Sequence, residues 1–239
     1  MSDASTSTER TPSQGVVLIG DVVSSRDHPD RPALQARLRD ALERANRSER
    51  VTQPLHIQLG DEFQGVVATL ADALCVGLDV RLDLLPDVEL RIGVGVGPFW
   101  VFDVEATPIS QDGPAWWAAR RAIESAKALG GRPGTRHVRS WAVALGEDGR
   151  EAEVTEPMPF ATVNAYLGLQ DFVLASMRPR HLRLLAAALR GEPQREVARR
   201  EGITQSAVSQ ALSSSGAQAL VLALGALSGA ATAGVSAPG

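Results

Sequence analysis

Sulfur chemistry is nearly absent from the sequence, because Cys75 is the only cysteine among 239 residues. No internal disulfide can therefore form. The four histidines are not spaced with one another or with Cys75 as metal ligands are, which excludes a zinc site built from these residue types. The start of the chain also lacks a basic segment followed by an apolar one. These absences predict a protein of the reducing cytoplasm.

Charge is missing from the last part of the sequence. No residue from 216 to 239 is charged, but the large apolar residues stop at Leu227, so this stretch is too short for a membrane span. We predict a packing or dimerisation helix over 217–227 and a disordered tail over 230–239. Residues 1–14 are rich in Ser and Thr and carry no large apolar side chain after Met1, which predicts a second disordered tail.

The composition is otherwise ordinary for a globular protein, with 44% hydrophobic and 22% charged residues. The formal net charge of -4 conceals a basic segment, since residues 178–201 hold seven arginines against three glutamates. A small basic module beside an acidic remainder favours nucleic-acid binding by that module. A solvated helix face would give the same pattern, and charge alone does not separate the two.

Apolar periodicity predicts strands that alternate with helices in the first two thirds of the chain. Strands are expected at 15–23, 55–59, 63–69, 90–96 and 137–143, and helices at 32–46, 70–85, 113–129 and 161–176. The order β-α-β-β-α-β-α-β predicts an α/β (α+β), ferredoxin-like domain over 15–146. An acidic segment with two prolines, 147–160, is the expected linker to an all-α module over 161–229.

Acidic residues stand at two turning points of the predicted sheet. Asp21 lies near the end of the first strand, and Asp61 lies beside Glu62 in a tight turn between two strands. In a ferredoxin-like sheet these strands are neighbours, so the carboxylates would lie together and could hold Mg²⁺ or Mn²⁺. Taken singly, Asp61 is equally explained as a turn former and Asp21 as a strand-end cap.

The residues after Asp21 connect a strand to a helix, a position where backbone amides can hold a phosphate. The candidate phosphate-binding residues are Val22, Val23, Ser24 and Ser25. Trp116 and Trp117 follow each other in the helix predicted at 113–129. One of them is expected to pack in the core, and the second is a candidate for stacking on a nucleotide base.

Several of these segments resemble known nucleotide-processing domains. The segments Asp21–Ser25, Gly60–Phe63 and Arg91–Gly97 resemble the phosphate loop, hairpin and core strand of class III nucleotide cyclases, and the hairpin also resembles that of diguanylate cyclases. The helix from Gly113 is similar to the one that carries a cyclase's transition-state Asn and Arg. The closest overall resemblance is to the SatD family of bacterial proteins, through GDEFQG, the glycine-alternating strand and GPAWWAAR. It implies a palm-type fold with a following helix-turn-helix.

The resemblance to cyclases is incomplete at the base-reading positions. Ile57 stands where a cyclase has its base-reading Lys, and Trp117 stands where it has the Asn. Arg121, four residues after Trp117 and on the same helix face, takes the place of the transition-state Arg. This pattern favours a domain that binds a nucleotide, through Trp117 and Arg121 among others, over a working cyclase.

The C-terminal module contains three predicted helices, at 181–190, 193–200 and 204–213, spaced as in a helix-turn-helix. Gly202 provides the turn, Thr204 caps the third helix, and Val208 and Leu212 face the core. The residues expected to contact DNA bases or phosphates are Thr204, Gln205, Ser206, Ser209, Gln210, Arg195, Arg199 and Arg200. A helical module that only forms a homodimer would show the same spacing.

Three functions are compatible with these features. The first is a cytoplasmic, homodimeric transcription regulator that binds DNA and responds to a metal-bound nucleotide. The second is a metal-dependent enzyme that makes or cleaves a phosphodiester on a nucleoside triphosphate, with Arg121 as a catalytic residue. The third is a palm domain retained only as a dimer scaffold. The sequence does not identify the nucleotide or the DNA site.

Overall fold

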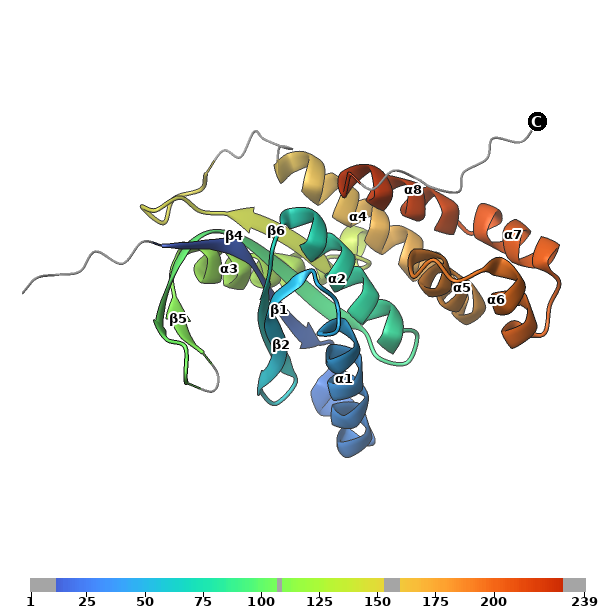
Figure 1. Cartoon of the computed structure of the whole chain (residues 1–239), viewed down its shortest axis with the longest axis horizontal. Coiled ribbons are helices and arrows are strands. Elements are labelled where there is room, and N and C mark those ends of the chain that lie inside the picture. The colour runs from blue at the N-terminus through green and yellow to red at the C-terminus, as the bar shows by residue number, and fades with distance from the viewer. Residues whose placement is uncertain (1–11, 107–108, 153–159, 230–239) are drawn as a thin grey trace, which may run out of the picture.

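The computed structural model describes residues 12–106, 109–152 and 160–229 (Figure 1). Most of the tail expected at 1–14, the middle of the expected linker and the tail at 230–239 lie outside the described residues. The structure is a mixed α/β fold with one mixed sheet, and the predicted order of strands and helices is confirmed apart from one additional short strand.

Six strands form the sheet, in the order β2-β3-β1-β4-β5, with β6 also paired to β4. They are β1 Ser13–Val22, β2 Val51–Leu59, β3 Glu62–Val67, β4 Leu90–Asp103, β5 Ser110–Asp112 and β6 Ser140–Ala144. The strand β1 lies between β3 and β4 and is antiparallel to both, whereas β6 is parallel to β4. The predicted position of β1 beside the β2–β3 hairpin is confirmed. Neither β5 nor the extension of β4 beyond residue 96 was expected from the sequence.

Helices cover both faces of the sheet. The helices α1, Arg31–Ala45, and α2, Leu70–Leu84, lie on the face to which Val16 and Leu18 of β1 point. The helix α3, Pro114–Gly130, lies on the opposite face, against Val17 and Ile19. This alternation along β1 follows from the two-residue period of a strand.

The glycines of β4 allow α3 to lie directly on the strand. A Cβ atom at Gly95 would overlap the carbonyl oxygen of Ala115 and the amide nitrogen of Ala119, and one at Gly93 would overlap the carbonyl oxygen of Ala119. Alternate glycines leave one face of a strand without side chains, which permits the close approach of a ligand, a helix or another backbone. The approaching group is the helix α3.

Five helices follow the sheet: α4 Phe160–Ser176, α5 Pro179–Leu189, α6 Gln194–Glu201, α7 Gln205–Ser214 and α8 Ala217–Leu227. Their buried residues belong to the same apolar core as α1 and α2. The helices α5 and α8 contact α2, whereas α6 and α7 lie farther from it (Figure 1). A buried ion pair between Arg81 of α2 and Asp171 of α4 lies in this core, with side chains 2% and 0% exposed. Asp171 also accepts hydrogen bonds from the backbone N–H groups of Arg139 and Ser140.

Two outer strands of the sheet, β2 and β6, are each hydrogen-bonded by an asparagine side chain. The Asn46 amide accepts from the N–H of Leu55 in β2 (2.7 Å) and donates to its C=O (2.9 Å). The Asn164 amide does the same for Ala142 in β6, at 2.8 and 2.9 Å. Each amide therefore replaces one residue of a neighbouring strand.

The expectation that residues 216–239 hold no membrane span can be compared with the described helices. No single helix in the described ranges is long and apolar enough to cross a membrane. The helices α7 and α8 reach the required length and composition only as a pair, and the chain bends by 73° between them.

Candidate functional site

The carboxylate of Asp21 lies near the end of β1, on the face that α3 covers. The register of the sheet places Arg91 of β4 directly opposite, and Arg91 Nη1 donates to both carboxylate oxygens, at 2.7 and 2.9 Å. The two side chains are 25% and 16% exposed. Asp21 is therefore half-buried, with a cation on one side.

Burial raises the pKa of Asp21 above its ordinary value, since a carboxylate loses hydration when it is removed from water. The charge of Arg91 and its hydrogen bonds lower this pKa, whereas the negative charge of Asp61 raises it further. The charge of Asp61 therefore acts on Asp21, as expected for two carboxylates on the same part of the sheet. A cation bound between them would remove both the repulsion and part of the cost of burial.

Glu62 is held by a different partner. Its two carboxylate oxygens accept hydrogen bonds from Arg120 Nη1 and Nη2 of α3, at 2.6 and 2.7 Å, and this bidentate pairing raises the pKa of Arg120. Across the described ranges, no three His, Cys, Asp or Glu side chains converge as a metal site. Asp21 and Asp61 fit Mg²⁺ or Mn²⁺ only if phosphate oxygens or waters complete the coordination, as is usual for Mg²⁺.

The structure of the loop after β1 reduces the number of residues that could bind a phosphate. The side chain of Val22 is buried, and the Val23 N–H already donates to the Glu89 carbonyl at 2.8 Å, so the Val23 amide is not open to a phosphate. Ser24 has a φ of 54°, the one positive value at a non-glycine residue in the described part of the chain, and the short 3-10 helix Ser25–Asp27 follows it.

This backbone geometry leaves three consecutive amides open. The N–H groups of Asp27 and His28 donate to the carbonyls of Ser24 and Ser25. The N–H groups of Ser24, Ser25 and Arg26 meet no acceptor among the described residues. A left-handed residue followed by right-handed ones turns such amides toward one point, which is a concave anion site.

Trp117 and Arg121 lie on another flank of α3. Trp117 is 49% exposed and its Nε1 donates to Asp112, at 2.9 Å. Arg121 pairs with Glu151, at 2.6 Å. Between them, Ala118 packs toward β6. The two residues share a helix face, as predicted, but the structure does not bring either one to Asp21.

The flank of α3 that does face the carboxylates was missed by the sequence analysis. Trp116 is 8% exposed and packs edge-to-face on Phe99, with ring centroids 6.5 Å apart, which confirms that one tryptophan belongs to the core. Arg120 is one turn further along this flank, and Lys127, the only lysine in the sequence, lowers the pKa of Asp21. The spacing from a buried Trp116 was the available signal for Arg120.

The second candidate site is formed by α6 and α7. Gly202 ends α6 with a φ of 66°, and the Thr204 hydroxyl accepts the Ala207 N–H at 3.2 Å, which caps α7. Val208 and Leu212 are buried, as predicted. The candidate DNA-contacting residues are all exposed: Thr204, Gln205, Ser206, Ser209, Gln210, Arg195, Arg199 and Arg200.

The cations on α6 differ in their partners. Arg200 donates a hydrogen bond to Glu192, and Arg183 of α5 pairs with Glu201 at 2.7 Å. Arg195 and Arg199 have no ion pair with any described residue, so their guanidinium groups face solvent. These two arginines are the ones that a phosphate backbone could reach without breaking an internal pair.

Comparison with known proteins gives a family match and similarity to solved structures. The family model described as "SatD family" matches residues 15–223. No curated protein matches the chain. The crystal structure of the adenylyl cyclase CyaB from P. aeruginosa is similar at 14% identity and a TM-score of 0.30, over 44% of this chain and 68% of that one.

Proposed function

This chain belongs to the SatD family, and we propose that it is a transcription regulator whose α/β part binds a metal-bound nucleotide and whose α6–α7 pair binds DNA as a helix-turn-helix. The observation that carries the ligand half is the repulsion between the Asp21 and Asp61 carboxylates, together with the open backbone amides of residues 24–26 that follow β1. Mg²⁺ or Mn²⁺ is held by few carboxylates and several phosphate oxygens, which matches this donor set.

The chain's own residues would divide the work at this site. Asp21 and Asp61 would hold the metal ion, which would supply the positive charge that orients the phosphates. The N–H groups of Ser24, Ser25 and Arg26 would bind phosphate oxygens. Arg91, released from Asp21 by the metal, would add a cation beside them.

The DNA-binding half is supported by the surface of α7. Exposed hydroxyl and amide side chains on this surface can hydrogen-bond to base edges in a major groove. They belong to Gln205, Ser206, Ser209 and Gln210. Arg195 and Arg199 of α6 are exposed and could contact the phosphates of the DNA backbone. Two copies related by a two-fold axis would place their α7 helices in successive major grooves, about 34 Å apart.

Coupling between the two halves is supported by the continuity of the core. The helix α2 packs on the sheet and on α5 and α8. A shift of β1 against α2 would therefore also displace the helices that hold α7 in position. We propose that nucleotide binding alters DNA affinity by this route.

The ligand half is tested by incubating the protein with mixed nucleotides and Mg²⁺ or Mn²⁺ and identifying what is retained by mass spectrometry. Asp61→Asn should abolish retention, and it should also abolish any protection of Lys127 from an amine reagent. Asp148→Asn, a change at an exposed carboxylate outside the site, is the matched control and should leave both unchanged. Retention that survives in Asp61→Asn would exclude this site.

The DNA half is tested with sequences selected by the purified protein. Arg199→Gln should weaken binding to all sequences alike and reduce the slope of log affinity against log salt by about one. Gln205→Ala should instead relax the preference at particular base pairs. DNA affinity that is the same with and without every retained nucleotide would contradict the coupling.

A second function, that of a phosphodiester-forming or -cleaving enzyme, is favoured by one observation. Arg120 stands on the carboxylate flank of α3, where a cation would stabilise charge on a transferring phosphate. Product formed from a nucleoside triphosphate should then be lost in Asp61→Asn and in Arg120→Gln. Arg121→Gln is the matched control, because Arg121 pairs with Glu151 elsewhere.

A further inference from the structure

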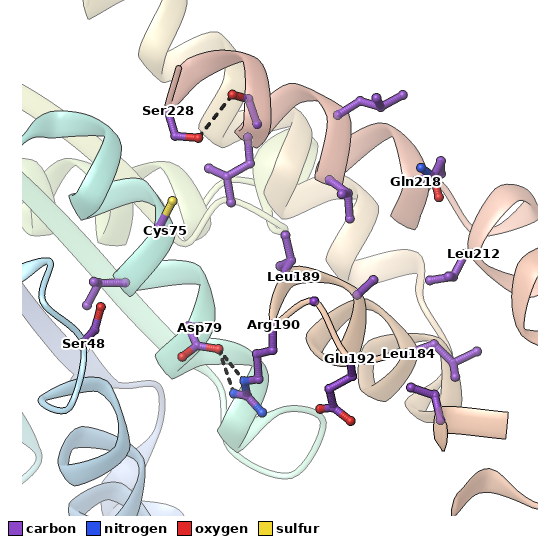
Figure 2. A pocket seen from close by; sticks show the side chains of 18 of the residues that line it. Ser48, Cys75, Asp79, Leu184, Leu189, Arg190, Glu192, Leu212, Gln218 and Ser228 are labelled. Atoms are coloured by element: carbon purple, nitrogen blue, oxygen red, sulfur yellow. Dashed lines mark hydrogen bonds and ion pairs between the residues drawn. The ribbon is translucent and has the colours of Figure 1, made fainter. Parts of the chain in front are cut away.

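A cavity of about 710 Å³ lies on the other side of the sheet from the carboxylates, where α1 and α2 meet α5, α7 and α8. Figure 2 shows Cys75 of α2 on one side of it, with Leu189 of α5 and Gln218 of α8 on the other. Small-molecule sites are typically about 300–1,000 Å³ and often lie between parts of a protein. The cavity has that size and that position.

One part of the wall is cationic. Arg44, Arg50 and Arg190 come from three different segments and all line the cavity. The guanidinium of Arg50 makes one ion pair with Asp72, at 3.2 Å, but donates no hydrogen bond to any described residue. Positive hydrogen-bond donors thus remain available at this end.

The carboxylates of the wall are already paired. Asp79 accepts hydrogen bonds from Arg190 Nε and Nη2, at 3.0 and 2.7 Å, and Glu192 accepts one from Arg200. Each arginine of the wall is paired in turn, Arg44 with Asp83, Arg50 with Asp72 and Arg190 with Asp79 and Asp83, so the wall carries little net charge. The guanidinium of Arg50 keeps donors that its ion pair does not use, and an anionic group on a bound molecule would accept hydrogen bonds from them.

The rest of the wall is aliphatic. Leu184 and Leu189 of α5 face Val221 and Leu224 of α8 across the space, and Val76 of α2 adds a further side. None of the lining residues in the described chain is aromatic. A nucleotide base would find no ring to stack on, whereas a saturated chain would bury its surface favourably.

We propose that this cavity binds a small amphipathic organic acid, with its carboxylate beside Arg50 and its aliphatic body between α5 and α8. The proposal is independent of the nucleotide and DNA functions above, because no residue of the carboxylate site lines the cavity.

The single cysteine provides a site-specific probe of occupancy. Cys75 lines the cavity and is half-buried, and burial raises the pKa of its thiol. Alkylation by iodoacetamide at alkaline pH, followed by intact mass spectrometry, therefore reports access to the cavity alone. Decanoate is the probe ligand, and decanol and decyltrimethylammonium carry the same chain with a neutral or a cationic head.

Decanoate should slow Cys75 alkylation several-fold, and the two other head groups should not. Arg50→Gln should remove the protection, whereas Arg47→Gln, a matched change outside the cavity wall, should keep it. Gly225→Leu should slow alkylation without any ligand, because its side chain fills the space. Equal protection by all three head groups, no protection by decanoate, or protection retained in Arg50→Gln would overturn the proposal.

Discussion

The helices on the two faces of the sheet pack against it through different kinds of contact. Against α3, small apolar clusters lie beside solvent-accessible ion pairs, such as Asp21–Arg91 and Glu62–Arg120. Against α2, one apolar core continues through α4 and α5 to α8 and contains a single deeply buried ion pair. Charge on the α3 face can therefore change at little cost, whereas a change on the α2 face is transmitted to every C-terminal helix.

The largest loss in the free energy of unfolding is expected when the buried ion pair of Arg81 and Asp171 is broken. Asp171→Ala should lower the free energy of unfolding by about 3–5 kcal/mol, because it leaves Arg81 buried without its counter-ion. Urea unfolding followed by circular dichroism measures the loss. The double variant Arg81→Met with Asp171→Leu should recover most of it, and a loss below about 1 kcal/mol for Asp171→Ala would contradict burial of the pair.

The continuity of the α2 face is tested by a cavity in α5. Leu185 is 0% exposed, and Leu185→Ala should cost about 3 kcal/mol. All four tryptophans lie between residues 100 and 141, so their fluorescence reports on the α/β part, whereas helical circular dichroism also reports on α5–α8. The two signals should shift together. Separate transitions would show that the C-terminal helices unfold as an independent unit.

A much smaller cost is expected for an ion pair on the α3 face. Arg120 is 46% and Glu62 27% exposed, so Glu62→Gln should lower the free energy of unfolding by less than about 1 kcal/mol. The same urea titration serves as the measurement, and high salt should reduce the difference further. A cost comparable to that of Asp171→Ala would remove the contrast between the faces.

The smallest effect is expected in a pH profile. The pKa of Asp21 is raised in the folded protein, so its contribution to stability is fully present below its unfolded pKa, near 3.8, and is lost as pH rises through the folded pKa. The free energy of unfolding of the native chain relative to Asp21→Asn should therefore fall as pH rises from 3.8 toward neutrality. Mg²⁺ with a bound nucleotide should flatten this slope, and a slope of opposite sign would contradict the burial of Asp21.

The sequence predicted the order of the elements well because apolar period and turn residues are local properties. It missed β5, since Ser110–Asp112 contains no apolar residue and pairs only through the backbone of β4. It paired Trp117 with Arg121 correctly on one helix face. The rotation of α3 against the sheet, which brings Arg120 to the carboxylates instead, depends on packing at Gly93 and Gly95.

Other parts of the site could not be predicted from the sequence, because they depend on strand register and on packing between segments that are distant in the chain. Arg91 stands opposite Asp21 only because Gly20 pairs with Ile92 and Asp21 with Arg91 along β1 and β4. A packing or dimerisation helix was predicted over 217–227, and nothing in its apolar period distinguishes packing on a second copy from packing against α2. The DNA-binding, metal-binding and nucleotide-binding roles remain predictions, as do the proposed domain boundaries.

The two asparagine amides at Leu55 and Ala142 have a consequence for how copies of the protein can associate. An exposed outer strand is a template for edge-to-edge aggregation, because its unpaired backbone groups accept any extended chain. Asn46 and Asn164 occupy both the N–H and the C=O at one point on β2 and on β6. A further strand could add at these points only by displacing the amide, so the two amides disfavour a continuous intermolecular sheet through β2 or β6.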